Sequence, residues 1–90
     1  MAIQIHIPTP MRQHTEGKAV VDATGHNVQA VLDDVGRQYP AFTQRIFENG
    51  RVRRFINIYL NEEDIRYLQD LNSATKDGDQ LAIIPAVAGG

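Results

Sequence analysis

The last two residues of the sequence, Gly89 and Gly90, have the clearest chemical potential in the chain. Glycine lacks a Cβ atom, so a Gly-Gly end is narrow enough to enter a tight enzyme tunnel. A free α-carboxylate on the last residue is ionised at neutral pH and is a poor electrophile. An enzyme that uses ATP can convert it to an acyl-adenylate, and attack by a sulfur donor then gives a thiocarboxylate. The ending is therefore the one that covalent sulfur transport at Gly90 would require.

Other interpretations of the same ending stay open from these residues alone. It could be a frayed chain end, a remnant of an expression vector or a cut made before a further domain.

The residues before the glycines, Val87 and Ala88, are small and apolar. We expect them to thread into the active site of a partner enzyme together with Gly89.

The remaining reactive side chains do not form a recognisable catalytic or metal site. The histidines, His6, His14 and His26, lie 8 and 12 residues apart, which matches no compact zinc motif. There is no cysteine, and this excludes disulfides, thiolate metal sites and a cysteine nucleophile. The sequence contains no phosphate-binding glycine motif and no nucleophile elbow. We therefore predict a protein without its own catalytic residues and without a bound metal.

Two clusters of charge stand out. Glu62, Glu63 and Asp64 are consecutive, which favours a solvated acidic turn over an acid–base pair. Arg51, Arg53 and Arg54 form the only basic cluster, which is too short and too poor in aromatic residues for a nucleic-acid site. The simpler interpretation of the arginines is a solvated strand entry. The functional alternative is a docking patch for an acidic partner, and it would include the neighbouring Phe55.

Composition sets the class of protein. The chain has 90 residues, of which 42% are hydrophobic and 22% are charged, and its formal net charge is −2. This length fits one domain with a modest core. The charge balance argues against an extended nucleic-acid surface. The sequence has neither a signal-peptide pattern nor an apolar run of membrane-spanning length, so we expect a cytoplasmic protein with no membrane partner.

The periodicity of apolar residues predicts two strands followed by helical structure. Alternation at residues 3–7 and a second apolar run at 18–24 indicate a hairpin, with a polar loop before Gly17. Apolar residues spaced for one helical face indicate a helix over 28–39, with Asn27 as its N-cap. A short second helix is expected over 41–47.

The second half of the chain is predicted to be mostly extended. Residues 54–60 form the clearest strand pattern, and residues 65–68 are expected to form a further short strand. The last strand is expected over 80–85, and residues 86–90 are left as a tail with a maximal reach of roughly 16–18 Å. Turns are expected at Asn49-Gly50, at residues 61–64 and at residues 77–79. This order of elements predicts a small α+β domain.

The chain resembles the ubiquitin-like sulfur carriers of the ThiS/MoaD superfamily over essentially its full length. The resemblance is carried by the opening strand at residues 3–8, the helix at 28–39 and the closing segment from Asp77 through Pro85 to the Gly-Gly end. Residues 54–66 together with the ending look most like the CysO type. The resemblance implies a β-grasp fold over residues 1–85, a mixed sheet of four to five strands packed on one main helix. It also implies a flexible Gly-Gly tail over 86–90.

The resemblance further implies how the protein is used. Gly90 would be adenylated by an E1-like enzyme of the MoeB/ThiF type, which uses the ATP, and would then carry sulfur as a thiocarboxylate with no other cofactor bound. A pyridoxal-phosphate cysteine synthase acting on an activated serine would receive the sulfur. A zinc metallopeptidase would then release the cysteine that has been added to Gly90.

Alternatives remain within and outside this family. A MoaD-like small subunit would donate sulfur to molybdopterin together with the large subunit of molybdopterin synthase. Archaeal-type relatives also modify proteins at lysine, and the chain could do the same. A ubiquitin-like binding module would instead use its sheet face or its arginines, and its C-terminal end would be incidental.

Overall fold

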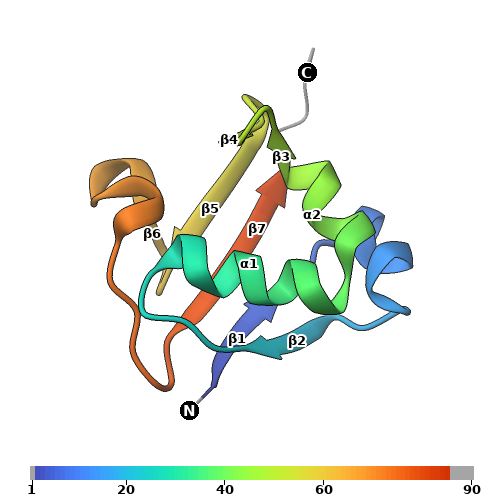
Figure 1. Ribbon diagram of the computed structural model, residues 1–90, viewed down its shortest axis with the longest axis horizontal. Helices are drawn as coiled ribbons and strands as arrows, with labels where there is room; N and C mark the ends of the chain where they lie inside the picture. The colour runs from blue at the N-terminus through green and yellow to red at the C-terminus, as the bar shows by residue number, and fades with distance from the viewer. Residues whose placement is uncertain (1, 86–90) are drawn as a thin grey trace.

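The computed structural model describes residues 2–85 of the chain (Figure 1). The expected flexible tail, residues 86–90, lies outside the described residues. In the part that is described, one sheet carries one main helix on one of its faces (Figure 1). This arrangement confirms the prediction of an α+β architecture.

The sheet contains five strands in the order β2-β1-β7-β5-β6. They are β1 (Ile3–His6), β2 (Val20–Ala23), β5 (Ile56–Leu60), β6 (Glu63–Asp64) and β7 (Gln80–Pro85). Strands β1 and β7 pair in parallel, whereas the other neighbours pair antiparallel. The sheet is therefore mixed, as predicted.

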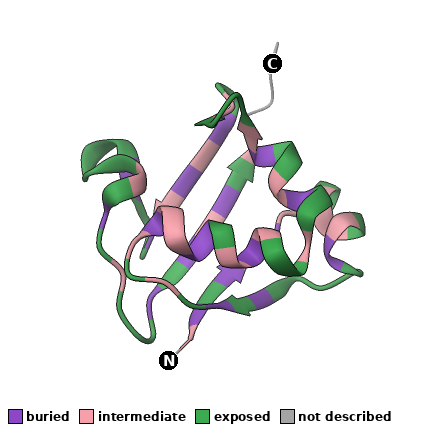
Figure 2. Ribbon diagram, viewed as in Figure 1, coloured by how far each residue is buried: buried purple, intermediate pink, exposed green. Residues whose placement is uncertain are grey.

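The main helix, α1 (Val28–Gln38), crosses the sheet and buries one apolar stripe against it (Figure 2). Helix α1 ends before Tyr39 because Pro40 disfavours a helical conformation for the residue before it. A second helix, α2 (Pro40–Ile46), begins at Pro40 itself. Both helices confirm the predicted ones to within a residue or two. Their fully buried apolar side chains are Val28, Val31, Leu32, Val35, Phe42 and Ile46.

Two strand pairs are closed by two-residue turns in which both residues have positive φ. Asn49-Gly50 joins β3 (Phe47–Glu48) to β4 (Arg51–Val52), with φ values of 54° and 78°. Asn61-Glu62 joins β5 to β6, with φ values of 50° and 72°. Positive φ at both central residues matches the right-handed twist of the paired strands. The expected acidic turn therefore spans only two residues, and the next two form a strand.

The prediction of a strand over residues 65–68 was wrong. Ile65–Tyr67 form a 3₁₀ helix, η2, and a second one, η3, spans Asp70–Asn72. The carboxylate of Asp64 accepts a hydrogen bond from the backbone N–H of Arg66 at 2.9 Å, and this turns the chain out of the sheet. The stretch expected to be a polar loop before Gly17 likewise contains a 3₁₀ helix, η1 (Thr9–Thr15).

The prediction that Asp64 belongs to a solvated acidic turn was also wrong. Asp64 is buried, and its carboxylate is held by the guanidinium of Arg66 at an Nη2–Oδ2 distance of 2.7 Å. Hydrogen bonds from this guanidinium, and next from the Arg66 backbone N–H, lower the pKa of the Asp64 carboxyl although burial opposes the shift. The pair therefore stabilises the link between β6 and η2 when Asp64 is ionised.

The N-cap of α1 gives a direct test of this fold. The Oδ1 atom of Asn27 accepts a hydrogen bond from the Ala30 backbone N–H at 2.8 Å. Asn27→Ala should lower the free energy of unfolding by about 1 kcal/mol, because the N–H loses its acceptor. Asn27→Ser keeps an acceptor and should stay within a few tenths of a kcal/mol of wild type. Urea unfolding followed by circular dichroism measures both, and equal losses in the two variants would contradict the capping role.

The Asp64–Arg66 pair predicts a pH dependence of stability. A carboxyl whose pKa is lowered in the folded state stabilises the fold above its unfolded pKa and loses that contribution as the pH falls. Wild type should therefore exceed Asp64→Asn in free energy of unfolding at pH 7, and the difference should shrink towards pH 3. Glu63→Gln, an exposed neighbour on the same strand, is the matched control. A difference that is constant with pH would rule out this contribution of the ionised carboxylate.

Candidate functional site at the end of strand β7

Strand β7 occupies the centre of the sheet, between β1 and β5. Its side chains alternate between the two faces, as a central strand requires. Leu81 and Ile83 are buried towards α1, whereas Ala82 and Ile84 lie on the opposite face. Ile84 remains 44% exposed. The strand that leads to the C-terminal segment is therefore fixed by apolar packing on one face.

The start of β7 is fixed by the Asp77-Gly78-Asp79 turn that the sequence predicted. Asp77 accepts a hydrogen bond from the backbone N–H of Ala2 at 2.8 Å, and Gly78 supplies the positive φ of 89° that the turn needs. Asp79 is buried, and its carboxylate accepts hydrogen bonds from the Asn61 side chain at 3.0 Å and the Lys76 backbone N–H at 2.9 Å. The turn thus ties β7 to both β1 and β5.

The described chain ends at Pro85, whose Cα partner across the sheet is Ile56 on β5. The predicted attachment site, Gly90, lies five residues further along the sequence. It falls outside the described residues, and so do the expected threading residues Val87, Ala88 and Gly89. What the structure does give is the position of Pro85, the last described residue before this segment.

The three arginines of the expected docking patch have different environments. Arg51 and Arg54 are exposed. Arg53 instead pairs with Glu48 at 3.4 Å and donates from Nη2 to the Gln44 carbonyl at 3.2 Å. Its backbone N–H also donates to the carbonyl of Ile46 at 2.8 Å. Arg53 therefore ties the hairpin to α2.

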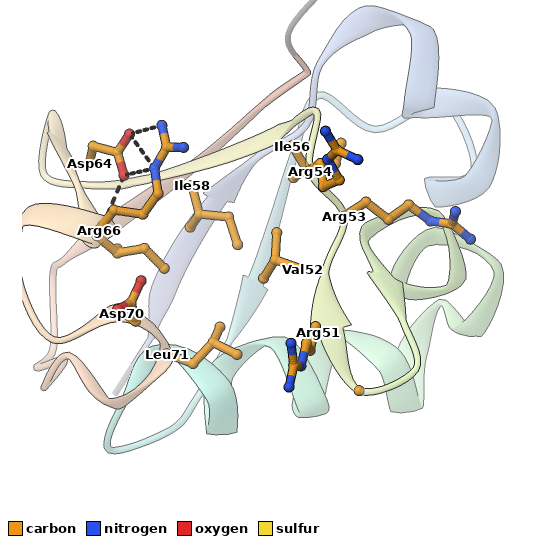
Figure 3. Close-up of a pocket in the computed structure, with 12 residues that line it drawn as sticks. Arg51, Val52, Arg53, Arg54, Ile56, Ile58, Asp64, Arg66, Asp70 and Leu71 are labelled. Carbon is orange, nitrogen blue, oxygen red and sulfur yellow. Dashed lines mark hydrogen bonds and ion pairs between the residues drawn. The ribbon is translucent and has the colours of Figure 1, made fainter.

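Arg51 and Arg54 border a groove of about 410 Å³ between the β3–β4 hairpin, β5 and the η2–η3 segment (Figure 3). Three apolar side chains, Val52, Ile58 and Leu71, point into it from these three parts of the fold (Figure 3). We call this feature the arginine groove. Its lining also includes Arg53, Ile56, Asp64, Ile65, Arg66 and Asp70.

Sequence reasoning did not associate Arg66, Asp70 and Leu71 with the arginine cluster. They come from the η2–η3 segment and are separated from the cluster by all of β5 and β6. No short-range pattern in the sequence could have linked them, because only the reversal of the chain at the β5–β6 turn brings the two segments together.

Phe55 belongs to a different part of the surface. It is 45% exposed and lines a second hollow with Met11, His14 and Arg45. Of the apolar residues in this strand region, Ile58 is buried in the core, whereas Phe55 is not.

Within residues 2–85, no group of three or more histidine or acidic side chains is arranged to hold a metal ion. His6 contacts the Gln80 side chain at 3.1 Å between Nε2 and Oε1. No helix in this part of the chain is long and apolar enough to cross a membrane.

The model of the ThiS family matches residues 5–90. The chain is 41% identical to the sulfur carrier protein CysO of Mycobacterium tuberculosis over 93 residues, covering 100% of both chains.

Solved structures show the same relationship. The CysO-type chain in the Amycolatopsis orientalis BexX/CysO complex matches with a TM-score of 0.93 and 43% identity, over 99% of this chain and 100% of that one. Small archaeal modifier protein 1 of Methanosarcina acetivorans matches with a TM-score of 0.87 and 30% identity, over 99% of this chain and 96% of that one.

These matches confirm both the ubiquitin-like β-grasp fold and the resemblance to the CysO type. The sequence match to CysO extends over the whole chain, including residues 86–90. The chain belongs to the ThiS family.

Proposed function

We propose that this chain is a sulfur carrier whose C-terminal carboxylate, on Gly90, is converted to a thiocarboxylate that supplies sulfur for cysteine synthesis. The observation that carries the proposal is the 41% identity to a sulfur carrier protein over the full length of both chains. Residues 89 and 90 of this chain are the Gly-Gly pair that such chemistry needs.

The proposed reaction has two steps, and a partner enzyme catalyses both. A carboxylate oxygen of Gly90 attacks the α-phosphorus of ATP, and pyrophosphate leaves. A donor that carries sulfur at the oxidation level of sulfide then attacks the carbonyl carbon, and AMP leaves with the bonding electron pair. Glycine suits both steps because it is narrow and has no stereocentre that could racemise while the carbonyl is activated.

Two carboxylates with shifted pKa values, those of Asp34 and Asp64, have structural roles. The carboxylates of Asp34 and Asp64 both have a pKa below the usual value, and hydrogen bonds from backbone N–H groups and arginines account for it. Such carboxylates hold elements together and are poor general bases at neutral pH. The CysO protein of Mycobacterium tuberculosis is named a sulfur carrier, and ATP in this scheme belongs to the activating enzyme.

The proposed partners are those that the resemblance to the CysO type implies. An E1-like enzyme of the MoeB/ThiF type would adenylate Gly90, and a pyridoxal-phosphate cysteine synthase would transfer the sulfur to an activated serine. The cysteine would then remain joined to Gly90 until a zinc metallopeptidase released it. The solved complex of a CysO-type chain with BexX supports the idea that such a carrier docks onto a protein partner.

Removing the Gly89-Gly90 pair should abolish charging and leave the fold intact, because the core lies within residues 2–85. The assay incubates the chain with ATP, sulfide and the adenylating enzyme from the same genome, and mass spectrometry of the C-terminal fragment detects the thiocarboxylate. Lys76→Gln, a change at an exposed position away from the C-terminal segment, keeps the Gly-Gly end and is the control, which should be charged normally. Charging of the truncated chain would contradict the proposal.

The choice between cysteine and molybdopterin synthesis is open to a second test. Charged carrier incubated with the cysteine synthase and an activated serine should gain one cysteine residue beyond Gly90. The same charged carrier incubated with the large subunit of molybdopterin synthase and the molybdopterin precursor should keep its sulfur. The reverse result would assign the chain to molybdopterin synthesis.

A further inference from the structure

The arginine groove has an apolar floor and a charged rim, a combination that the sulfur chemistry at Gly90 does not use. Ile56, Ile58 and Ile65 are buried at its base, and Val52 and Leu71 are half-buried and point into it (Figure 3). Five apolar side chains from the hairpin, β5 and the η2–η3 segment thus converge on one hollow. A hollow of this kind can accept an apolar side chain from outside.

The rim carries positive charge that the described residues leave uncompensated. Four arginines and two aspartates line the groove. Arg53 is paired with Glu48, and Arg66 is paired with Asp64. Among residues 2–85, Arg51 and Arg54 make no ion pair, and both are exposed. The side of the groove that carries Arg51 and Arg54 is therefore positively charged and would attract carboxylates.

The other side of the groove is held rigid. Arg66 donates from Nη2 to Asp64 at 2.7 Å and to Asn57 at 2.9 Å, so its guanidinium is already oriented by the protein. Asp70 lies on this side and makes no ion pair within the described part of the chain. An occupant should therefore present its carboxylates to Arg51 and Arg54 and keep them away from Asp70.

The groove also lies beside the point where the C-terminal segment leaves the sheet. Ile56 lines the groove and is the cross-strand partner of Pro85. Paired residues of antiparallel strands have Cα atoms about 4.5–5.5 Å apart. A partner that holds the residues after Pro85 covers about 800 Å² of this chain in a typical interface. An interface of that area beside Ile56 can reach the groove that Ile56 lines.

From these observations, we infer that the arginine groove is a docking site for a segment of the adenylating enzyme that combines an apolar side chain with neighbouring carboxylates. The inference rests on the proposed function, because it takes the partner to be the enzyme that activates Gly90. The apolar side chain packs on Val52, Ile58 and Leu71. The carboxylates pair with Arg51 and Arg54, which adds electrostatic attraction to the encounter of the two proteins.

Reversing the two rim charges tests the inference. In Arg51→Glu/Arg54→Glu, the apparent KM for the carrier in the charging reaction should rise at least about tenfold, with kcat within about twofold of wild type. The difference should narrow as NaCl is raised, because salt screens exposed charges. Arg45→Glu/Lys76→Glu makes the same change in net charge elsewhere on the surface and should behave as wild type. Equal KM values in the two double variants would overturn the inference.

Direct binding separates this inference from the proposed function. The affinity of each variant for the adenylating enzyme is measured by calorimetry without ATP, after thermal unfolding has confirmed that the variants fold. Weaker binding of the Arg51/Arg54 variant supports the docking site even if the wild type is never charged. Binding that is unchanged by the variant overturns it, and so does a wild type that does not bind.

Cross-linking identifies what occupies the groove. The chain has no cysteine, so Asp70→Cys provides a single attachment point for a photoreactive group in the groove and leaves Arg51 and Arg54 in place, and Lys76→Cys is the control position. The probe at position 70 should mark an enzyme peptide that contains both an apolar residue and a carboxylate. Cross-links to a basic peptide, or to a second copy of this chain in place of the enzyme, would overturn the inference.

Discussion

The placement of β7 between two neighbours is the constraint on which the rest of this structure depends. β7 pairs with β1 on one side and β5 on the other, so its register is fixed along both edges. A slip by one residue would move Leu81 and Ile83 from the core to the opposite face, which the loss of apolar burial forbids. The chain therefore leaves the sheet at one defined place, next to β5, and everything proposed for Gly90 and for the arginine groove depends on that exit.

Most of the fold could be predicted from the sequence because the relevant signals are local. The helical face of α1 and the Asn49-Gly50 turn were both predicted and are confirmed. The wrong strand prediction concerns a place where a side chain accepts a hydrogen bond from a backbone N–H that could otherwise pair within the sheet. Asp64 accepts a hydrogen bond from the Arg66 backbone N–H, so residues 65–67 form a 3₁₀ helix in place of a strand.

The candidate site was predictable only in part, for a different physical reason. The Gly-Gly end can be identified from the residues alone, whereas the arginine groove is assembled by the topology of the sheet. Arg54 and Leu71 meet across one hollow because the chain reverses between β5 and β6. The sequence does not distinguish Arg53 from the other two arginines. In the structure Arg53 forms an ion pair with Glu48 and donates a hydrogen bond to a backbone carbonyl of α2. The basic cluster thus combines one structural arginine with two that are exposed.

The proposed division of labour places reactivity at one end of the chain and stability and recognition in the folded body. The measurement that tests it most directly is fragment mass spectrometry of the protein purified from its own cells without acid or reducing agents. The account predicts that one terminal oxygen of Gly90 is replaced by sulfur, and the mass change must map to the C-terminal fragment because oxidation of Met1 or Met11 adds a similar mass. A carboxylate that stays unmodified after incubation with ATP, sulfide and the adenylating enzyme would contradict it.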